Sequence, residues 1–157
     1  MPQLVKGGKF VFGWSKVHPD GRIRIPDDAL KEYDLSDEEK VILMSGSKKS
    51  GGFGITTIER LKNSKLNDLI VKFLQKEDNK EYNLNSLVIL NKNRMLAWAE
   101  IKPGGFLKVK EKILKSYGVS IGDELLSVRG SSLALGIIIK GSIYDEAKKH
   151  HNIQRFY

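Results

Sequence analysis

Hydrophobic and polar residues near the start of the chain follow the pattern of a β-hairpin. The stretch KFVFGWSKV is rich in aromatic and β-branched residues, and a PDG turn separates it from a second short apolar stretch, RIRIP. Alternation in RIRIP places Ile23 and Ile25 on one face of the second strand. Arg22 and Arg24 fall on the opposite face, and Pro26 closes the strand where a ladder N–H can be spared.

The pattern continues with a short amphipathic helix and two more strands. PDDALKEYDL has acidic residues near its start, which suits the helix dipole, and Leu30 with Tyr33 supplies a buried stripe. KVILMSG and FGITTI read as strands joined by a turn rich in glycine and serine. Upstream, QLVKGGKF predicts a further hairpin with its tip at Gly7–Gly8.

The same order of elements returns 84 residues later, in RMLAWAEI, a PGG turn, EKILKSYGV, DELLSVRG and ALGIII. The frame runs without a gap from Leu4/Val88 to Ile55/Ile139 and predicts an internal duplication. Its identical pairs are Trp14/Trp98, Pro19/Pro103, Gly21/Gly105, Leu30/Leu114, Lys31/Lys115, Tyr33/Tyr117, Ser36/Ser120, Gly46/Gly130, Ser47/Ser131, Gly52/Gly136 and Ile55/Ile139.

The duplication divides the chain into residues 1–58, a first repeat, and residues 88–157, a second repeat with a C-terminal helix. Residues 59–87 connect them, with a helix expected at about 64–77 and a polar linker after it. The C-terminal helix is expected to begin at Ser142, which with Asp145 reads as a cap. A unit of about 52 residues is near the lower limit for burying its own core, so we expect the repeats to share one core.

Net charge and cysteine content limit which cellular compartment and which binding partners are expected. The formal charge is +8 and the pI about 9.6, which favours polyanionic partners such as nucleic acid. Absence of cysteine excludes disulfides and thiolate zinc sites and fits a reducing compartment. The apolar run LALGIII is far below the ~20 residues of a membrane span, and the N-terminus lacks a signal-peptide core. We therefore expect a cytoplasmic protein with no membrane contact.

The order strand, turn, GRIRIP, short helix, GDELL, strand, glycine turn and strand resembles the swapped-hairpin DNA-binding domain of the AbrB, SpoVT, MazE and MraZ proteins. Their motif, Gly-Arg-apolar-x-Ile-Pro, is matched by GRIRIP in the first repeat, and their later Gly-Asp pair is matched by Gly122 and Asp123 in the second. The chain departs from the motif at Glu38 and Glu39, in place of Gly-Asp, and at Phe106 and Lys110, in place of Arg and Pro.

This resemblance implies a mainly β fold with short helices, in which two swapped-hairpin repeats form one pseudo-two-fold β-barrel beside the linking helix and the C-terminal helix. In the family the two copies usually come from a homodimer, and in MraZ-like proteins from a fused chain, which this tandem duplication resembles. Trp14 and Trp98 are then expected to be equivalent core residues. Pairing with a second chain, and hence a homo-oligomer, stays open.

The resemblance also implies that duplex DNA is the partner, contacted through a basic strand face. Arg22 and Arg24 lie about 6.5 to 7 Å apart along one strand face, roughly two nucleotide steps of DNA. The alternative is a solvated edge strand that its charges protect from aggregation. A symmetric DNA surface is not preserved, since Phe106 stands over Arg22 and only Lys108 over Arg24. The candidate DNA-binding residues are Lys16, Arg22, Arg24 and Lys108.

Two loops rich in glycine and serine, SGSKKSGGFG and RGSSLALG, are candidates for binding an anion through backbone N–H groups. They lack the ending of a P-loop and precede strands, so plain β-turns are the alternative. The candidate ligand-binding residues are Ser47, Ser50, Gly51, Gly52, Arg129 and Ser131.

Catalytic and metal-binding motifs do not stand out. There is no Ser-His-Asp order or paired-acid motif, and the adjacent His150 and His151 fall on different faces of the expected helix, which disfavours a zinc site. The sequence therefore predicts a protein that is not an enzyme and has no metal or cofactor. Three function classes remain: a DNA-binding transcriptional regulator, a ligand-sensing or assembly module on the same barrel that does not bind DNA, and an antitoxin-like protein. The last ranks lowest, because its usual sign is a long disordered tail and none is expected after the C-terminal helix.

Overall fold

Both repeats fold into the same succession of strands and helices, to which the second adds a final short strand. The computed structural model describes residues 3–4, 10–36, 40–65, 67–68, 87–91 and 94–157. The first repeat, which with its last helix extends past the expected end at residue 58, forms β1 (Gln3–Leu4), β2 (Phe10–Lys16), β3 (Arg22–Arg24), α1 (Asp27–Glu32), β4 (Lys40–Ser45), β5 (Phe53–Thr56) and α2 (Ile58–Lys62). The second forms β6 (Leu87–Asn91), β7 (Arg94–Lys102), β8 (Phe106–Lys108), α4 (Glu111–Ser116), β9 (Glu124–Arg129), β10 (Leu135–Ile138), α5 (Ser142–Lys148) and β11 (Arg155–Phe156).

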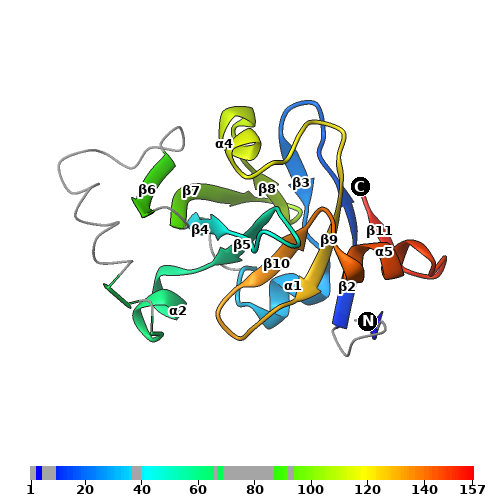
Figure 1. Cartoon of the computed structure of the whole chain (residues 1–157), viewed down its shortest axis with the longest axis horizontal. Helices are drawn as coiled ribbons and strands as arrows, with labels where there is room; N and C mark the ends of the chain where they lie inside the picture. The colour runs from blue at the N-terminus through cyan, green and yellow to red at the C-terminus, as the bar shows by residue number, and fades with distance from the viewer. Residues whose placement is uncertain (1–2, 5–9, 37–39, 66, 69–86, 92–93) are drawn as a thin grey trace.

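The strands of the two repeats interleave in one sheet. Its order is β1-β2-β9-β10-β5-β4-β7-β8-β3, with β11 paired to β2 and β6 paired to β7. The β2–β3 hairpin of the first repeat therefore pairs with β9 and β8 of the second, and β7–β8 pairs with β4 and β3 of the first. At the turn that joins β2 to β3, the His18 N–H donates to the Arg22 carbonyl at 2.9 Å, so the sheet nearly closes into a barrel. Figure 1 shows α1 and α4 on opposite sides of this barrel, with α2 and α5 toward its two ends.

The register of the sheet is pseudo-two-fold. When each residue is replaced by its counterpart in the other repeat, the β2–β9 pairing becomes the β7–β4 pairing. The same exchange leaves the β3–β8 and β5–β10 pairings unchanged. The facing residues are Trp14 with Leu126, Trp98 with Ile42, Ile23 with Leu107, and Gly54 with Gly136. The mainly β fold with short helices is confirmed, and its halves share one sheet.

The 84-residue frame fails at its end. In β5, Ile55 faces Leu43, whereas in the second repeat Ile137 faces Ser127, so Ile137 and not Ile139 is the counterpart of Ile55. The reason is the turn before the strand, which spans 46–52 in the first repeat and only 130–134 in the second. The pairing of Gly52 with Gly136 is wrong for the same reason. The offset returns to 84 where α2 and α5 begin.

Burial of both tryptophans is confirmed, at 3% and 7% exposure, but their expected place in the shared core is wrong. The barrel interior holds the largest cluster, which includes Ile23 and Leu107. Trp14 lies in a cluster beyond the sheet with Tyr144 of α5, whose ring is 5.1 Å away edge-on. Trp98 lies in a third cluster with Leu61 of α2. Each tryptophan is thus covered by a helix of the other repeat.

The helices differ from expectation in two places. The five-residue α2 was not predicted; Thr57 caps it by accepting the Arg60 N–H at 3.2 Å. The C-terminal helix is present, but Gly141 precedes its first residue and no side chain caps it, so Ser142 is not the cap. The expected helix at 64–77 and the hairpin tip at Gly7–Gly8 lie largely outside the described residues. The upstream hairpins form as β1–β2 and β6–β7.

The Pro-x-Gly turn is matched in the two repeats because each turn approaches the other repeat closely. Gly21 has φ +87, and a Cβ there would lie 2.4 Å from the Val109 carbonyl oxygen. Gly105 has φ +80, and its carbonyl accepts the Ile25 N–H at 2.9 Å. Only glycine adopts this conformation without strain, so the turn is tied to the interleaved packing.

Candidate functional site

The β3–β8 ladder brings three of the four predicted DNA-binding residues onto one outward face. Arg22 is directly opposite Lys108, and Arg24 is directly opposite Phe106. The residues between them, Ile23 and Leu107, are fully buried and anchor the ladder in the barrel interior. Side chains alternate across a strand, so burial of these two apolar residues turns the charged ones outward.

Arg24 is held in place by several partners. Its Nη2 lies 2.6 Å from Asp27 Oδ1, and its Nη1 donates to the Ile25 carbonyl. Its guanidinium carbon is 6.0 Å from the Phe106 ring centroid and 5.9 Å from that of Phe156. The side chain is only 20% exposed. Arg24 therefore supplies positive charge to this face from a fixed position, with few donors left for a partner.

Arg22 is more accessible, with 45% of its side chain exposed. Its guanidinium lies 5.0 Å from the Phe106 ring centroid, a cation–π distance, and its Nε is 2.6 Å from Asp20 Oδ2. The Arg22 backbone N–H donates to the Asp20 carboxylate at 3.1 Å, and this bond together with the guanidinium charge lowers the pKa of Asp20. A phosphate that reaches Arg22 competes with Asp20 for it.

The two predicted lysines flank this ladder. Lys108 is exposed at the end of β8, with Arg22 on one neighbouring strand and Glu100 on the other. Lys16 is exposed at the end of β2, opposite Glu124, and its ammonium is 6.0 Å from the Tyr157 ring centroid. Lys16 therefore belongs to the adjoining strand of the hairpin rather than to the β3–β8 ladder itself.

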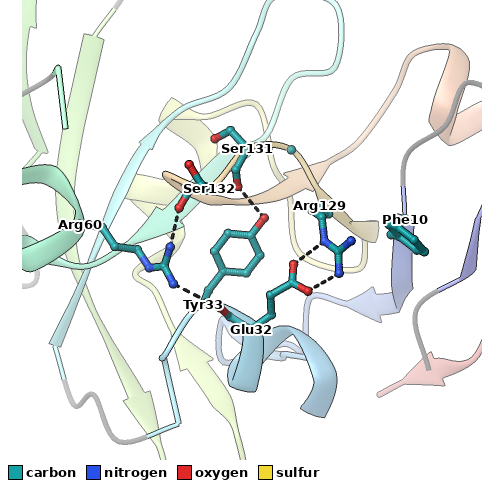
Figure 2. Close-up of a pocket in the computed structure, with 8 residues that line it drawn as sticks. Phe10, Glu32, Tyr33, Arg60, Arg129, Ser131 and Ser132 are labelled. Atoms are coloured by element: carbon teal, nitrogen blue, oxygen red, sulfur yellow. Dashed lines mark hydrogen bonds and ion pairs between the residues drawn. The ribbon is translucent and has the colours of Figure 1, made fainter. Parts of the chain in front are cut away.

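Two of the predicted ligand-binding residues, Arg129 and Ser131, line a cavity of about 540 Å³. Figure 2 shows that its walls come from β2, α1, α2, the end of β9 and the turn after it, hence from both repeats. The other lining residues are Phe10, Glu32, Tyr33, Arg60, Gly130 and Ser132. A cavity of this volume is in the usual range for small-molecule sites.

A paired acid and base form one wall of this cavity. Both carboxylate oxygens of Glu32 accept hydrogen bonds from Arg129, one from Nε and one from Nη2. Glu32 thereby raises the pKa of Arg129. The Arg129 guanidinium also lies 4.2 Å from the Phe10 ring centroid, so its planar group is held between a carboxylate and an aromatic face.

Tyr33 and Arg60 form the opposite wall. The Tyr33 hydroxyl donates to the Ser131 carbonyl at 2.8 Å, and burial, followed by the Glu32 charge, raises its pKa. Arg60 lies over the Tyr33 ring at 5.3 Å and donates to the Ser132 carbonyl. Its Nη2 also contacts Asp34 Oδ2 at 2.9 Å. The bonds to the Ser131 and Ser132 carbonyls tie the first repeat to the turn of the second.

The remaining predicted ligand-binding residues, Ser47, Ser50, Gly51 and Gly52, do not line this cavity. Their loop binds itself: the Gly51 N–H donates to the Ser47 carbonyl at 2.8 Å, and the Ser50 N–H donates to Ser47 Oγ at 3.2 Å. Because an anion needs free N–H groups, these bonds favour the plain-turn alternative for this loop.

Several residues of these sites were missed by sequence reasoning. Phe106 was noted only as a departure from the motif, yet its ring contacts both Arg22 and Arg24. Glu32 and Arg60 carried no signal, because each is a charged residue on a short helix and its partner lies in the other repeat. If the duplication had been used to pair the equivalent strands of the two repeats antiparallel, Phe106 would have been placed opposite Arg24.

The chemistry available at both places is binding through donors and aromatic faces. Within the described ranges no three His, Cys, Asp or Glu residues gather as a metal site, and no helix is long and apolar enough to cross a membrane. Comparison of the chain with protein-family models, with curated proteins and with solved structures gave no significant match.

Proposed function

We propose that this protein is a DNA-binding transcriptional regulator of the swapped-hairpin type, which contacts duplex DNA through the outward face of β3 and β8. The observation that carries the proposal is the register of that ladder, where Arg22 faces Lys108 and Arg24 faces Phe106. Basic groups from both repeats thus meet on one face, which is what binding to closely spaced phosphates requires.

The strand order supports the family part of the proposal. A hairpin of each repeat is inserted between strands of the other, so neither repeat completes the barrel alone. The resemblance to AbrB, SpoVT, MazE and MraZ domains, drawn from the GRIRIP and Gly-Asp motifs, implies this kind of interleaving. The β3–β8 ladder that bears GRIRIP also contains the pseudo-two-fold position, between Ile23 and Leu107.

A pseudo-two-fold face fits duplex DNA because the two strands of DNA are themselves related by local two-fold axes, as protein dimers on palindromic sites exploit. The repeats have diverged here, since Phe106 occupies the place that Arg22 has in the first repeat. The proposed complex is therefore asymmetric: the first repeat supplies Arg22 and Lys16, and the second supplies Lys108.

The roles of the four basic residues differ. Arg22 and Lys108 are the accessible cations of the ladder and contact phosphate directly in the proposed complex. Lys16 extends the contact along the β2–β3 hairpin. Arg24, which Asp27 and the Ile25 carbonyl already hold, acts mainly through its charge and by fixing the Phe106 ring.

Titration of a labelled duplex with the wild-type protein at several salt concentrations tests the proposal. Three phosphate contacts release counterions, so the logarithm of the association constant should fall with the logarithm of salt with a slope of roughly −2.7. Between about 50 and 200 mM salt the affinity should drop roughly forty-fold. A protein that shows no salt-dependent binding at the lowest ionic strength would instead support the ligand-sensing module.

A further inference from the structure

The cavity between α1, α2 and the turn after β9 is separate from the basic ladder, and nothing in the DNA-binding proposal uses it. We propose that it binds a small organic anion that carries both a carboxylate or phosphate group and a flat aromatic ring. This inference does not depend on DNA binding, because none of the residues that line the cavity is a proposed DNA contact. Figure 2 shows the two arginines on either side of Tyr33.

Arg129 is suited to hold the anionic group. A guanidinium carries five N–H donors, and Glu32 accepts from only Nε and Nη2. No partner is seen for Nη1 among the described residues, so the donors of that nitrogen can serve a ligand oxygen. Because Phe10 and Glu32 fix the orientation of the guanidinium, little side-chain entropy is lost when a ligand binds.

The charge of the cavity favours an organic anion over a bare inorganic one. Glu32 and Asp34 each neutralise one arginine, so the walls carry little net positive charge. Simple ion attraction is therefore weak, and the rest of the affinity must come from contact with apolar surface. The rings of Phe10 and Tyr33 provide that surface, and a flat ring matches it.

The walls are already in place before any ligand arrives. Tyr33 and Arg60 both donate to carbonyl groups of the 130–134 turn, at Ser131 and Ser132. The turn is the shorter of the two equivalent turns and belongs to the other repeat. A ligand here would contact both repeats at once and should stabilise their association.

The equivalent place at the other end of the barrel is built differently. The hydroxyl of Tyr117, the counterpart of Tyr33, shares its one hydrogen between the Met95 carbonyl at 3.0 Å and the Leu43 carbonyl at 3.3 Å, both in strands. Ser116 and Ser45 stand in place of Glu32 and Arg129, and Ser45 Oγ accepts the Met95 N–H at 2.9 Å. The acid–base pair and the guanidinium donors therefore belong to one end only, as expected when one copy acquires a site.

Isothermal titration with three probes, benzoate, adenosine monophosphate and inorganic phosphate, tests the proposal. The wild type should bind benzoate or adenosine monophosphate saturably and more tightly than phosphate, with a rise in melting temperature that grows with the logarithm of ligand concentration. Arg129→Gln should weaken that binding about tenfold or more, since a charged hydrogen-bonding partner is lost. Arg155→Gln removes one charge from β11, away from the cavity, and should change the affinity for the probes by less than about twofold.

A second variant separates occupancy of the cavity from stability of the fold. Arg60 donates to the backbone carbonyl of Ser132, so Ser132→Trp should keep that bond while the larger side chain fills the space. This variant should fold with a wild-type circular dichroism spectrum and lose probe binding. The proposal is overturned if neither ring-bearing probe binds saturably to the wild type, if phosphate binds as tightly as both, or if folded Ser132→Trp binds the probes as the wild type does.

Discussion

Trp14→Ala and Trp98→Ala should each lower the free energy of unfolding by about 3–5 kcal/mol, the usual cost of removing a large buried aromatic side chain. Each tryptophan fills a cluster between the sheet and a helix of the other repeat. The loss at Trp14 should be the larger of the two, because Trp14 also stacks edge-on with Tyr144 at 5.1 Å. Urea unfolding followed by circular dichroism gives both values.

The milder variants Trp14→Phe and Trp98→Phe test whether the two repeats unfold together. The sequence has only two tryptophans, so each variant leaves one fluorescent reporter, in one cluster or the other. An interleaved sheet predicts that fluorescence and circular dichroism give coincident transitions in each variant. A cost below about 1 kcal/mol for either alanine variant, or two separate transitions, would contradict the shared fold.

The double variant Arg22→Gln/Lys108→Gln should lose most of its affinity for duplex DNA. Removing two phosphate contacts should reduce the magnitude of the salt slope by about 1.8. This corresponds to a roughly sixty-fold loss of affinity for the duplex at about 0.1 M salt. The free energy of unfolding should change little, because Lys108 is exposed, nearly half of the Arg22 side chain is exposed, and neither residue fills the core. Fluorescence anisotropy with a labelled duplex, read at several salt concentrations, measures both quantities.

Lys62→Gln/Lys140→Gln is the matched control, since it removes the same charge from exposed lysines on α2 and after β10. If binding depends on the ladder, this control should keep nearly the wild-type salt slope. Equal losses in the two double variants would mean that net charge alone drives binding. The assignment of the contact to β3 and β8 would then be wrong.

Local patterns were enough to predict the repeated elements. The alternation in RIRIP correctly placed Ile23 and Ile25 inside, because the period of two is intrinsic to a strand. The offset of 84 also correctly related β3 to β8 and α1 to α4. The difference in length between the turns 46–52 and 130–134, which breaks the match of Ile55 with Ile139, was missed because isolated identities in a Gly- and Ser-rich turn match in more than one frame.

Contacts between repeats could not be predicted from these patterns. The sequence shows that Trp14 is apolar and large, but not that α5 of the other repeat covers it on the outer side of the sheet. Likewise, the partners of Arg24 include Phe156, which is 132 positions away in the chain. Glu32 and Arg129 are ordinary surface residues until the fold brings them together, so the cavity had only Arg129 and Ser131 as advance candidates.

The most direct test of the central claim is to map the DNA contact on the wild-type protein by amide chemical-shift changes during titration with a duplex. Contact through the pseudo-two-fold ladder predicts that the largest changes fall at residues 22–24 and 106–108, with smaller ones around Lys16. The same spectra should show little change at Tyr33 and Arg129, which line the cavity. Changes centred on that cavity or on the loop 46–52, or no changes at low salt, would contradict the account.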